Sequence, residues 1–270
     1  MEGEEQRVMS INRRNFILCA GTLAATAAFA RPIRSVLRNG DENSIEPDIP
    51  SSAEYVQTGL IHMWDGIENV GWGVHSYATT KWKDLMGDFD LAAQKGAAGW
   101  GSDHAKISKV DTGRGWYAEK LVTPAFVEVV FEMNGTPSSV YDTIFFTNGS
   151  VNTTRKRGQA LVKNGTLVFG ISDLDTLDIT DRYNEKLSFS IPLNSQVKNK
   201  ASIWYFCGAR VTAPSGTSAT NGTPEYLGIG GGWYGMEGNI YCVRFYSRVL
   251  TAEEVAFNHQ IDRERFGVGQ

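Results

Sequence analysis

The chain has few of the residues on which metal and redox sites depend. Its 270 residues include three cysteines and four histidines, and the histidines show no zinc-ligand spacing such as H-E-x-x-H. No G-x-S-x-G motif marks a nucleophilic serine. A G-x-G-x-x-G match at residues 230–235 is followed by a strand pattern and not by a helix, which argues against a dinucleotide-binding loop. The sequence therefore offers no familiar motif for hydrolysis or for a cofactor.

An excess of one charge is also absent, since 26 basic residues stand against 30 acidic ones, for a formal net charge of −4. Residues 1–30 hold three arginines and three glutamates, so the net charge is −4 without them as well. No basic patch indicates nucleic acid as a partner.

Long apolar runs are missing too, and the uncharged stretch Phe16–Ala30 is only 15 residues long. A membrane-spanning helix needs about 20 strongly apolar residues. Arg13 and Arg14 precede this stretch, and Ala28-Phe29-Ala30 ends it, which is the pattern of a cleaved twin-arginine export signal. We predict an export signal over residues 1–30 and a periplasmic, cell-surface or secreted protein with no stable membrane span in its mature form. A retained membrane anchor is the alternative.

Residues 31–54 mix Pro, Ser, Asn and charges, as a linker or flexible arm does. From residue 55 to residue 270 we expect one domain. Short β-rich runs separated by Gly, Asn and Pro fill it, and no long helical pattern precedes its end, which predicts an all-β fold. Asn164-Gly165 between two apolar runs predicts a tight hairpin. Cys207 and Cys242 lie in strand-like runs, and the sequence leaves open whether they form a disulfide.

The last part of the chain passes from an alternating strand pattern into a capped helix. Ile240, Cys242 and Arg244 are expected on one face of the strand, with residues 241, 243 and 245 on the other. Thr251 and Glu254 predict a capping box that opens a short terminal helix. Val255, Phe257 and Ile261 would be available to pack.

This ending resembles the closing element of concanavalin-A-like, laminin-G-like jelly rolls, which follow G-x-I-x-x-x-R-h-Y-x-R-x-L-t-x-x-E-h-x-x-N, with h apolar. The matching residues are Gly238, Ile240, Arg244, Tyr246, Arg248, Leu250, Glu254 and Asn258. A second block, Gly59–Asn69 with Trp82–Leu91, resembles the opening of laminin-G-like domains in bacterial surface proteins. The resemblance implies a two-sheet antiparallel jelly-roll sandwich with a short C-terminal helix, but a scaffold does not imply a chemistry.

Some relatives on this scaffold are glycosidases, so the carboxylates need a geometric test. Glu128 and Glu132 share one strand face about 13 Å apart at ~3.3 Å per residue, whereas glycosidase carboxylates stand at most about 9.5 Å apart. We expect both to lie on the solvated face of a sheet. A pair assembled from different strands is left open.

Calcium is a possible structural cofactor, because jelly rolls of this type often hold it at a loop edge. Two acidic loop groups could supply hard oxygen ligands. Their candidate residues are Asp173, Asp175, Asp88 and Asp90.

Exposed aromatic rings could bind carbohydrate, since their faces stack on the C–H surfaces of sugars. Trp233 and Tyr234 are the first candidates, followed by Trp72, Trp100 and Trp116 in other Gly-rich segments. The alternative for any one of these tryptophans is a place in the core. We therefore predict an exported, non-catalytic binding module for a glycan or a surface protein. A structural surface protein that makes protein contacts and a glycoside hydrolase are the alternatives.

Overall fold

The computed structural model describes residues 50–94, 98–108, 115–119, 124–138, 142–148, 156–169, 175–193, 203–212, 226–231 and 236–269. The predicted export signal, with Arg13, Arg14 and Ala30, lies outside these residues, as do residues 31–49 of the predicted linker. The description below concerns the unit that begins at Pro50.

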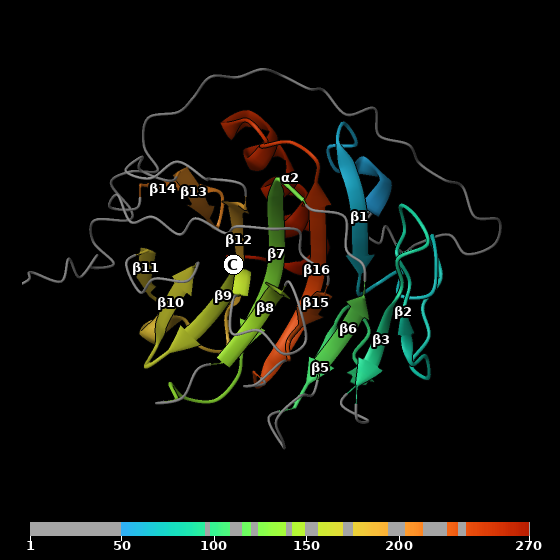
Figure 1. Ribbon diagram of the computed structural model, residues 1–270, viewed down its shortest axis with the longest axis horizontal. Coiled ribbons are helices and arrows are strands. Elements are labelled where there is room, and N and C mark those ends of the chain that lie inside the picture. The colour runs from blue at the N-terminus through green and yellow to red at the C-terminus, as the bar shows by residue number, and fades with distance from the viewer. Residues whose placement is uncertain are drawn as a thin grey trace, which may run out of the picture. The chain divides into compact units, whose positions relative to one another are not determined.

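The described residues form a two-sheet antiparallel β-sandwich with one C-terminal α-helix (Figure 1). This arrangement confirms the predicted all-β fold class. Sheet A has eight strands: β1 (Leu60–Asp65), β4 (Ala98–Trp100), β5 (Ala105–Ile107), β7 (Phe126–Met133), β12 (Lys186–Pro192), β13 (Ile203–Phe206), β14 (Ala209–Thr212) and β16 (Gly238–Tyr246). Sheet C also has eight: β2 (Lys81–Trp82), β3 (Leu91–Gln94), β6 (Gly115–Glu119), β8 (Asp142–Asn148), β9 (Lys156–Lys163), β10 (Thr166–Phe169), β11 (Asp175–Asp178) and β15 (Tyr226–Ile229).

The order in sheet A is β14-β13-β12-β7-β16-β5-β4, and β1 pairs with the C-terminal half of β16. Sheet C runs β11-β10-β9-β8-β15-β6-β3-β2. The other elements among the described residues are two 3-10 helices, Ser52–Glu54 and Thr180–Arg182, and the α-helix α2 (Ala252–Phe266). The hairpin predicted at Asn164-Gly165 joins β9 to β10, and both residues have positive φ, 50° and 75°.

The space between the sheets is filled by aromatic and aliphatic side chains. Trp82, Trp100 and Trp116 meet there, with ring centroids 4.8 to 5.7 Å apart. Trp64 and Trp204 are buried as well. Most of the tryptophans therefore serve packing, and their burial removes large apolar rings from water.

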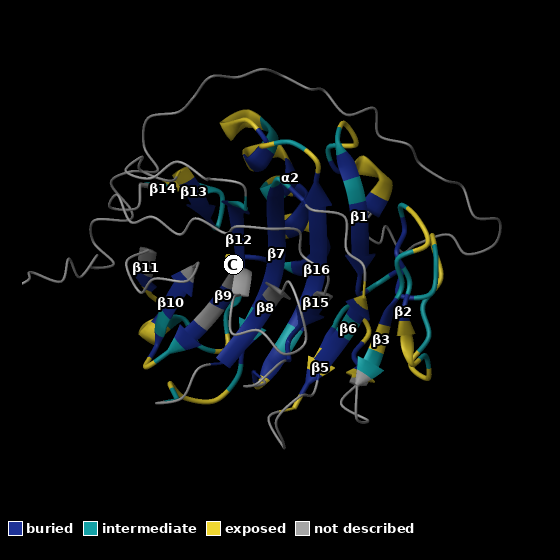
Figure 2. Cartoon of the chain, in the orientation of Figure 1, coloured by how far each residue is buried: buried dark blue, intermediate teal, exposed yellow. Residues whose placement is uncertain are grey.

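A second core lies between the outer face of sheet A and α2. The capping box predicted for α2 is confirmed, because Thr251 Oγ1 accepts the Glu254 N–H at 3.3 Å and Glu254 accepts the Thr251 N–H at 2.9 Å. Val255 and Ile261 pack into this core, whereas Phe257 stays 37% exposed, contrary to the prediction. With α2 on one side and sheet C on the other, β7 and β16 are buried on both faces (Figure 2).

The expected alternation along β16 is wrong at one point. The register against β7 pairs Ile240 with Phe131 and Cys242 with Val130, so Tyr241 is an extra residue in a β-bulge. Ile240 therefore faces the inter-sheet core with residues 243 and 245, while Tyr241 and Cys242 both face α2. A bulge moves one residue out of the two-residue period, which the sequence pattern did not reveal.

Among the described residues, no helix is long and apolar enough to cross a membrane. Cys207 and Cys242 are both free thiols. Burial raises the pKa of each, so neither has the environment of a reactive thiolate.

Candidate functional site

The connection between β1 and β2, residues 66–80, carries the largest exposed aromatic side chains in the described part of the chain. We call it the aromatic loop. Its tip is a tight turn in which Gly71 and Val74 form an isolated antiparallel bridge. Gly73 has φ +70°, a conformation that glycine adopts without steric cost. The turn lifts Trp72 to the tip, where the side chain is 46% exposed.

The indole of Trp72 is held in one orientation. Its Nε1–H donates to the carbonyl oxygen of Leu85 at 3.0 Å, which ties the tip to the segment after β2. Because this hydrogen bond occupies the only polar atom of the indole, the ring can offer a ligand its apolar face and not a donor. Such a fixed ring loses little conformational entropy when a flat ligand stacks on it.

Tyr77 lies five residues after Trp72 and is 67% exposed. Its ring packs edge-on against His75, with centroids 4.7 Å apart. His75 in turn makes a hydrogen-bond contact between its Nδ1 and the carbonyl oxygen of Gly66 at 3.1 Å. Asn69 exchanges two hydrogen bonds with the backbone of Ser76, at 2.8 and 2.9 Å. The exposed rings therefore stand on an ordered backbone.

The base of the aromatic loop holds two buried carboxyl groups. Asp65 Oδ1 accepts the N–H groups of Ile67 and Glu68, at 2.9 and 3.1 Å, and Asp65 Oδ2 pairs with Arg265 at 2.8 Å. Glu68 is 7% exposed and accepts the N–H of Gly73 at 3.1 Å. Burial raises the pKa of both carboxyl groups, and the charge of Asp65 raises that of Glu68 further.

Of the aromatic candidates named from the sequence, Trp72 is exposed, as stacking on a sugar requires. Trp100 is wrong as a surface candidate, because it is 6% exposed and its indole donates to Thr79 O beneath the aromatic loop. Trp116 is also buried in the inter-sheet core. Trp233 and Tyr234 lie outside the described residues. Sequence reasoning missed Tyr77, although the polar run around it could have indicated an exposed ring.

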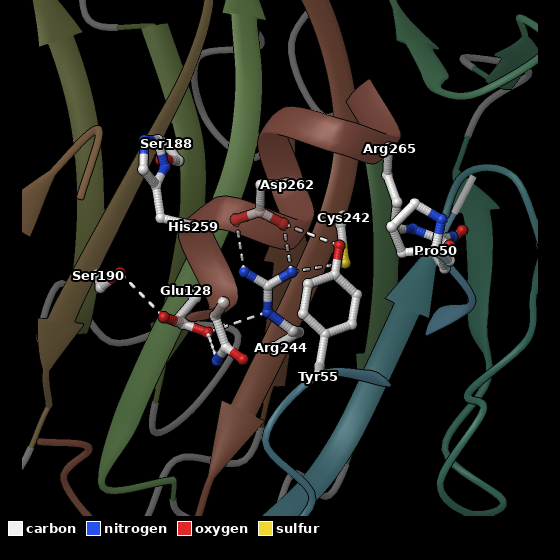
Figure 3. A network of polar contacts seen from close by, with 12 residues as sticks. Pro50, Tyr55, Glu128, Ser188, Ser190, Cys242, Arg244, His259, Asp262 and Arg265 are labelled. Carbon is white, nitrogen blue, oxygen red and sulfur yellow. Dashed lines mark hydrogen bonds and ion pairs between the residues drawn. The ribbon is translucent and has the colours of Figure 1, made fainter. Parts of the chain in front are cut away.

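Glu128 is not on a solvated face, contrary to the prediction. It is 2% exposed beneath α2 and accepts hydrogen bonds from Arg244 Nε at 2.9 Å, Asn258 Nδ2 at 2.7 Å and Ser190 Oγ at 3.1 Å (Figure 3). Burial raises the pKa of Glu128, and Arg244 opposes that rise. The three partners belong to β16, α2 and β12, so this carboxylate connects these elements to β7.

Glu132 is half-buried and also has protein partners. It accepts the hydroxyl of Tyr241 at 2.5 Å and the side-chain N–H of Asn239 at 3.0 Å. Burial and Glu132 together raise the pKa of Tyr241, so its hydroxyl is a poor nucleophile at neutral pH.

The residues of the C-terminal motif act on one another. Tyr246 OH accepts from Asn258 Nδ2 at 3.0 Å, and Arg248 reaches both oxygens of Glu254 at 2.6 and 2.7 Å. Asn258 Oδ1 also accepts the N–H of Val56 at 2.9 Å, which fastens the start of the domain to α2. The motif residues therefore connect α2 with β16 and with the segment that precedes β1.

The acidic candidates for calcium do not gather among the described residues, where no group of three or more His, Cys, Asp or Glu side chains could hold a metal ion. Asp90 accepts the Asp84 N–H at 3.1 Å and pairs with Lys83 at 3.2 Å. Asp88, two residues before Asp90, is exposed. Asp173 lies outside the described residues, as does the side chain of Asp175, so calcium binding stays a prediction.

No protein-family model and no curated protein matches the chain in sequence. Solved structures do match in fold. The Trypanosoma rangeli sialidase in complex with sialic acid aligns with a TM-score of 0.59 at 12% identity, over 82% of this chain and 35% of that one. A covalent intermediate of the same sialidase with 2,3-difluorosialic acid gives 0.58 at 13% identity, over 82% and 35%. A tryptophan-to-alanine mutant of HCR/D gives 0.55 at 12% identity, over 75% and 52%. The chain thus spans 35% of the sialidase chains and 52% of HCR/D, and the likeness shows a shared β-sandwich.

The prediction that the chain is not an enzyme needs correction. It rested on the absence of catalytic motifs, and the structures that share this sandwich include sialidases, which are enzymes. The fold is therefore no reason to exclude a glycosidase-like protein. At 12% identity it also assigns no activity to any residue of this chain.

Proposed function

We propose that the chain binds carbohydrate through the aromatic loop, with the ring of Trp72 as the stacking surface and Tyr77 as a second contact. One observation carries the proposal: two large aromatic side chains, 46% and 67% exposed, stand on a loop whose backbone is held by hydrogen bonds. Sugars present C–H faces that stack on such rings.

Two further features support this role. Trp72 is oriented by its hydrogen bond to Leu85 O, so the binding surface exists before a ligand arrives. The solved structures that share the fold include a sialidase in complex with sialic acid, which is a carbohydrate-related protein. Whether this chain also cleaves a glycan is a separate question, which a reducing-sugar assay on bound glycans answers.

We also propose, from the residue patterns alone, that residues 55–270 form a laminin-G-like domain and that the chain is exported. An exported protein meets glycans and surface proteins, so this proposal agrees with a binding role. A protein-contact role on a cell surface is the second candidate, because Val74, 53% exposed, adds an apolar side chain to the same tip.

A glycan array that includes neutral and sialylated oligosaccharides, probed with the full chain, tests the proposal. The wild-type chain should bind a subset of the array, and Trp72→Ala should lose about tenfold or more in affinity, as removal of a central aromatic contact does. Phe257→Ala is the matched control, because Phe257 is an exposed aromatic residue on α2 and away from the loop in sequence. Binding that survives both Trp72→Ala and Tyr77→Ala would overturn the assignment of the site. No binding anywhere on the array would favour the protein-contact role.

A further inference from the structure

Glu68 is a buried residue that contacts the backbone of the exposed tip. Its Oε1 accepts the N–H of Gly73, the residue directly after Trp72, at 3.1 Å. Its other oxygen, Oε2, is buried and has no hydrogen-bond partner among the described residues. A carboxyl group 7% exposed thus uses one oxygen to hold the turn, and the other oxygen has no protein partner among the described residues.

The charges around Glu68 come from two other elements. Asp65 at the end of β1 is fully buried, and Arg265 of α2 pairs with it at 2.8 Å. Both lie close enough to Glu68 to act on it electrostatically. Two buried carboxyl groups therefore share one guanidinium, which neutralises only one of them.

An ionised carboxylate with an unpartnered oxygen costs far more free energy inside a protein than a neutral carboxyl group with the same oxygen. Asp65 has the direct ion pair and two backbone N–H donors, so it is the better place for the negative charge. Among the described residues, Glu68 has one N–H donor and no direct ion pair. As the pH falls, a proton therefore binds to Glu68 before it binds to Asp65.

We infer that Glu68 positions the aromatic tip by holding the Gly73 amide, and that it does so best as a neutral carboxyl group beside the Asp65–Arg265 ion pair. The biological meaning of this inference rests on the proposed function, because a positioned Trp72 matters only if the ring binds something. The hold itself is a property of the free protein and can be measured without any glycan.

This arrangement sets a pH dependence for the tip. Burial and the charge of Asp65 raise the pKa of Glu68, while Arg265 and the Gly73 N–H oppose that rise. A carboxyl group with a raised pKa favours the ordered state at low pH, and its contribution is lost as the pH rises through that pKa. The tip should therefore loosen as Glu68 ionises.

The experiment measures the solvent exchange of indole protons by NMR in the full chain, labelled with 15N at its tryptophans. Trp72→Phe assigns the Trp72 signal. Glu68→Gln keeps an oxygen for the Gly73 N–H and cannot ionise, whereas Glu68→Ala removes the acceptor. The buried indoles of Trp64 and Trp82, which donate to Phe89 O and Asp65 O, report on the rest of the domain.

In Glu68→Ala, the Trp72 indole should exchange about tenfold faster than in the wild type, which corresponds to about 1.4 kcal/mol of lost local protection. The Trp64 indole should be unchanged, and Glu68→Gln should restore the wild-type rate for Trp72 at low pH, where Glu68 of the wild type is neutral. Base catalysis speeds the exchange of every indole proton as the pH rises. In the wild type, the exchange of the Trp72 indole should rise more steeply than base catalysis predicts. In Glu68→Gln it should follow base catalysis alone.

Equal Trp72 exchange in the wild type and Glu68→Ala would overturn the inference, as would an acceleration of all indoles together, which would make Glu68 a general stabiliser of the domain. A wild-type pH profile identical to that of Glu68→Gln would overturn the neutral state. These outcomes are distinct from a failure of the proposed function, which appears as absent glycan binding while the Trp72 exchange behaves as expected.

Discussion

Arg244 and Asp262 form a two-point ion pair inside the protein, with Nη1 to Oδ1 at 2.7 Å and Nη2 to Oδ2 at 2.8 Å, and both side chains are 2% exposed. Burial alone would lower the pKa of Arg244, but Asp262 and Glu128 raise it well above its ordinary value. The ring of Tyr55 covers the guanidinium at 4.0 Å, and its hydroxyl donates to Asp262 at 2.8 Å (Figure 3). The pair thus joins β16, α2 and the first residues of the domain.

Replacement of Asp262 by Asn should destabilise the chain by about 3–5 kcal/mol, because the buried guanidinium of Arg244 loses a charged partner. Urea unfolding followed by circular dichroism measures the change. Gln260→Ala, at an exposed position of the same helix, is the control and should stay within about 0.5 kcal/mol of the wild type. A loss below about 1 kcal/mol for Asp262→Asn would contradict this account of the network.

The ion pair between Arg248 and Glu254 should make α2 sensitive to acid. The hydrogen bond from Arg248 holds the pKa of Glu254 below its ordinary value of 4.5. A group with a lowered pKa stabilises the fold above its unfolded value, and that contribution is lost as the pH falls through the folded one. The melting temperatures of the wild type and Glu254→Gln should therefore differ near pH 7 and converge below pH 4.5. The difference should be under about 1 kcal/mol, because the pair is partly exposed. A gap that stays constant with pH would argue against the pairing.

The hairpin between β9 and β10 should not tolerate a side chain at Gly165. An added Cβ would lie 2.9 Å from Cβ and 3.0 Å from Cα of Thr180, at φ +75°. Gly135 has a similar φ of +81° with nothing within 4 Å, so Gly135→Ala isolates the backbone strain, which is about 1–2 kcal/mol. Thermal unfolding should show a clearly larger loss for Gly165→Ala than for Gly135→Ala. Equal losses would mean that Thr180 moves away at no cost.

Three buried tyrosines should make the domain sensitive to alkali. Burial raises the pKa of Tyr55, Tyr241 and Tyr246 above the ordinary value of 10.0. Because the folded chain keeps these protons, the stabilisation is present below pH 10.0 and is lost as the pH rises further. In an alkaline titration, the absorbance of these tyrosinates should appear together with the loss of the circular dichroism signal. Burial also raises the pKa of Tyr183, to about 12.

Tyr246→Phe gives the matched test of that behaviour. The variant should retain the fold at neutral pH and lose stability less steeply above pH 10.0, since one ionisable group is gone. Tyrosinate absorbance that develops fully before any loss of structure would contradict the prediction.

Local features were predictable from the sequence where a few neighbouring residues decide the conformation. Thr251 with Glu254 predicted the helix start, because a capping box satisfies backbone N–H groups within one turn. Asn164-Gly165 predicted a tight hairpin for the same local reason, since both residues tolerate positive φ. The motif residues predicted the sandwich class, which the structure confirms.

Positions that depend on a distant element were not predictable. Glu128 was expected to be solvated because it shares a strand face with Glu132, but α2, more than a hundred residues later in the chain, covers that face. Trp100 and Trp72 both lie among glycines, yet one packs against Trp82 and the other stands at a turn tip.

The sequence by itself determined the class of fold, the capped terminal helix and the tight turn, because each follows from residue periodicity or from contacts within a few residues. Only the tertiary structure decided which aromatic rings are exposed and which carboxyl groups are buried. Exposure depends on which element packs on each face. A bulge such as the one at Tyr241 moves the side chains that follow it to the opposite face, and the two-residue sequence pattern does not indicate this change.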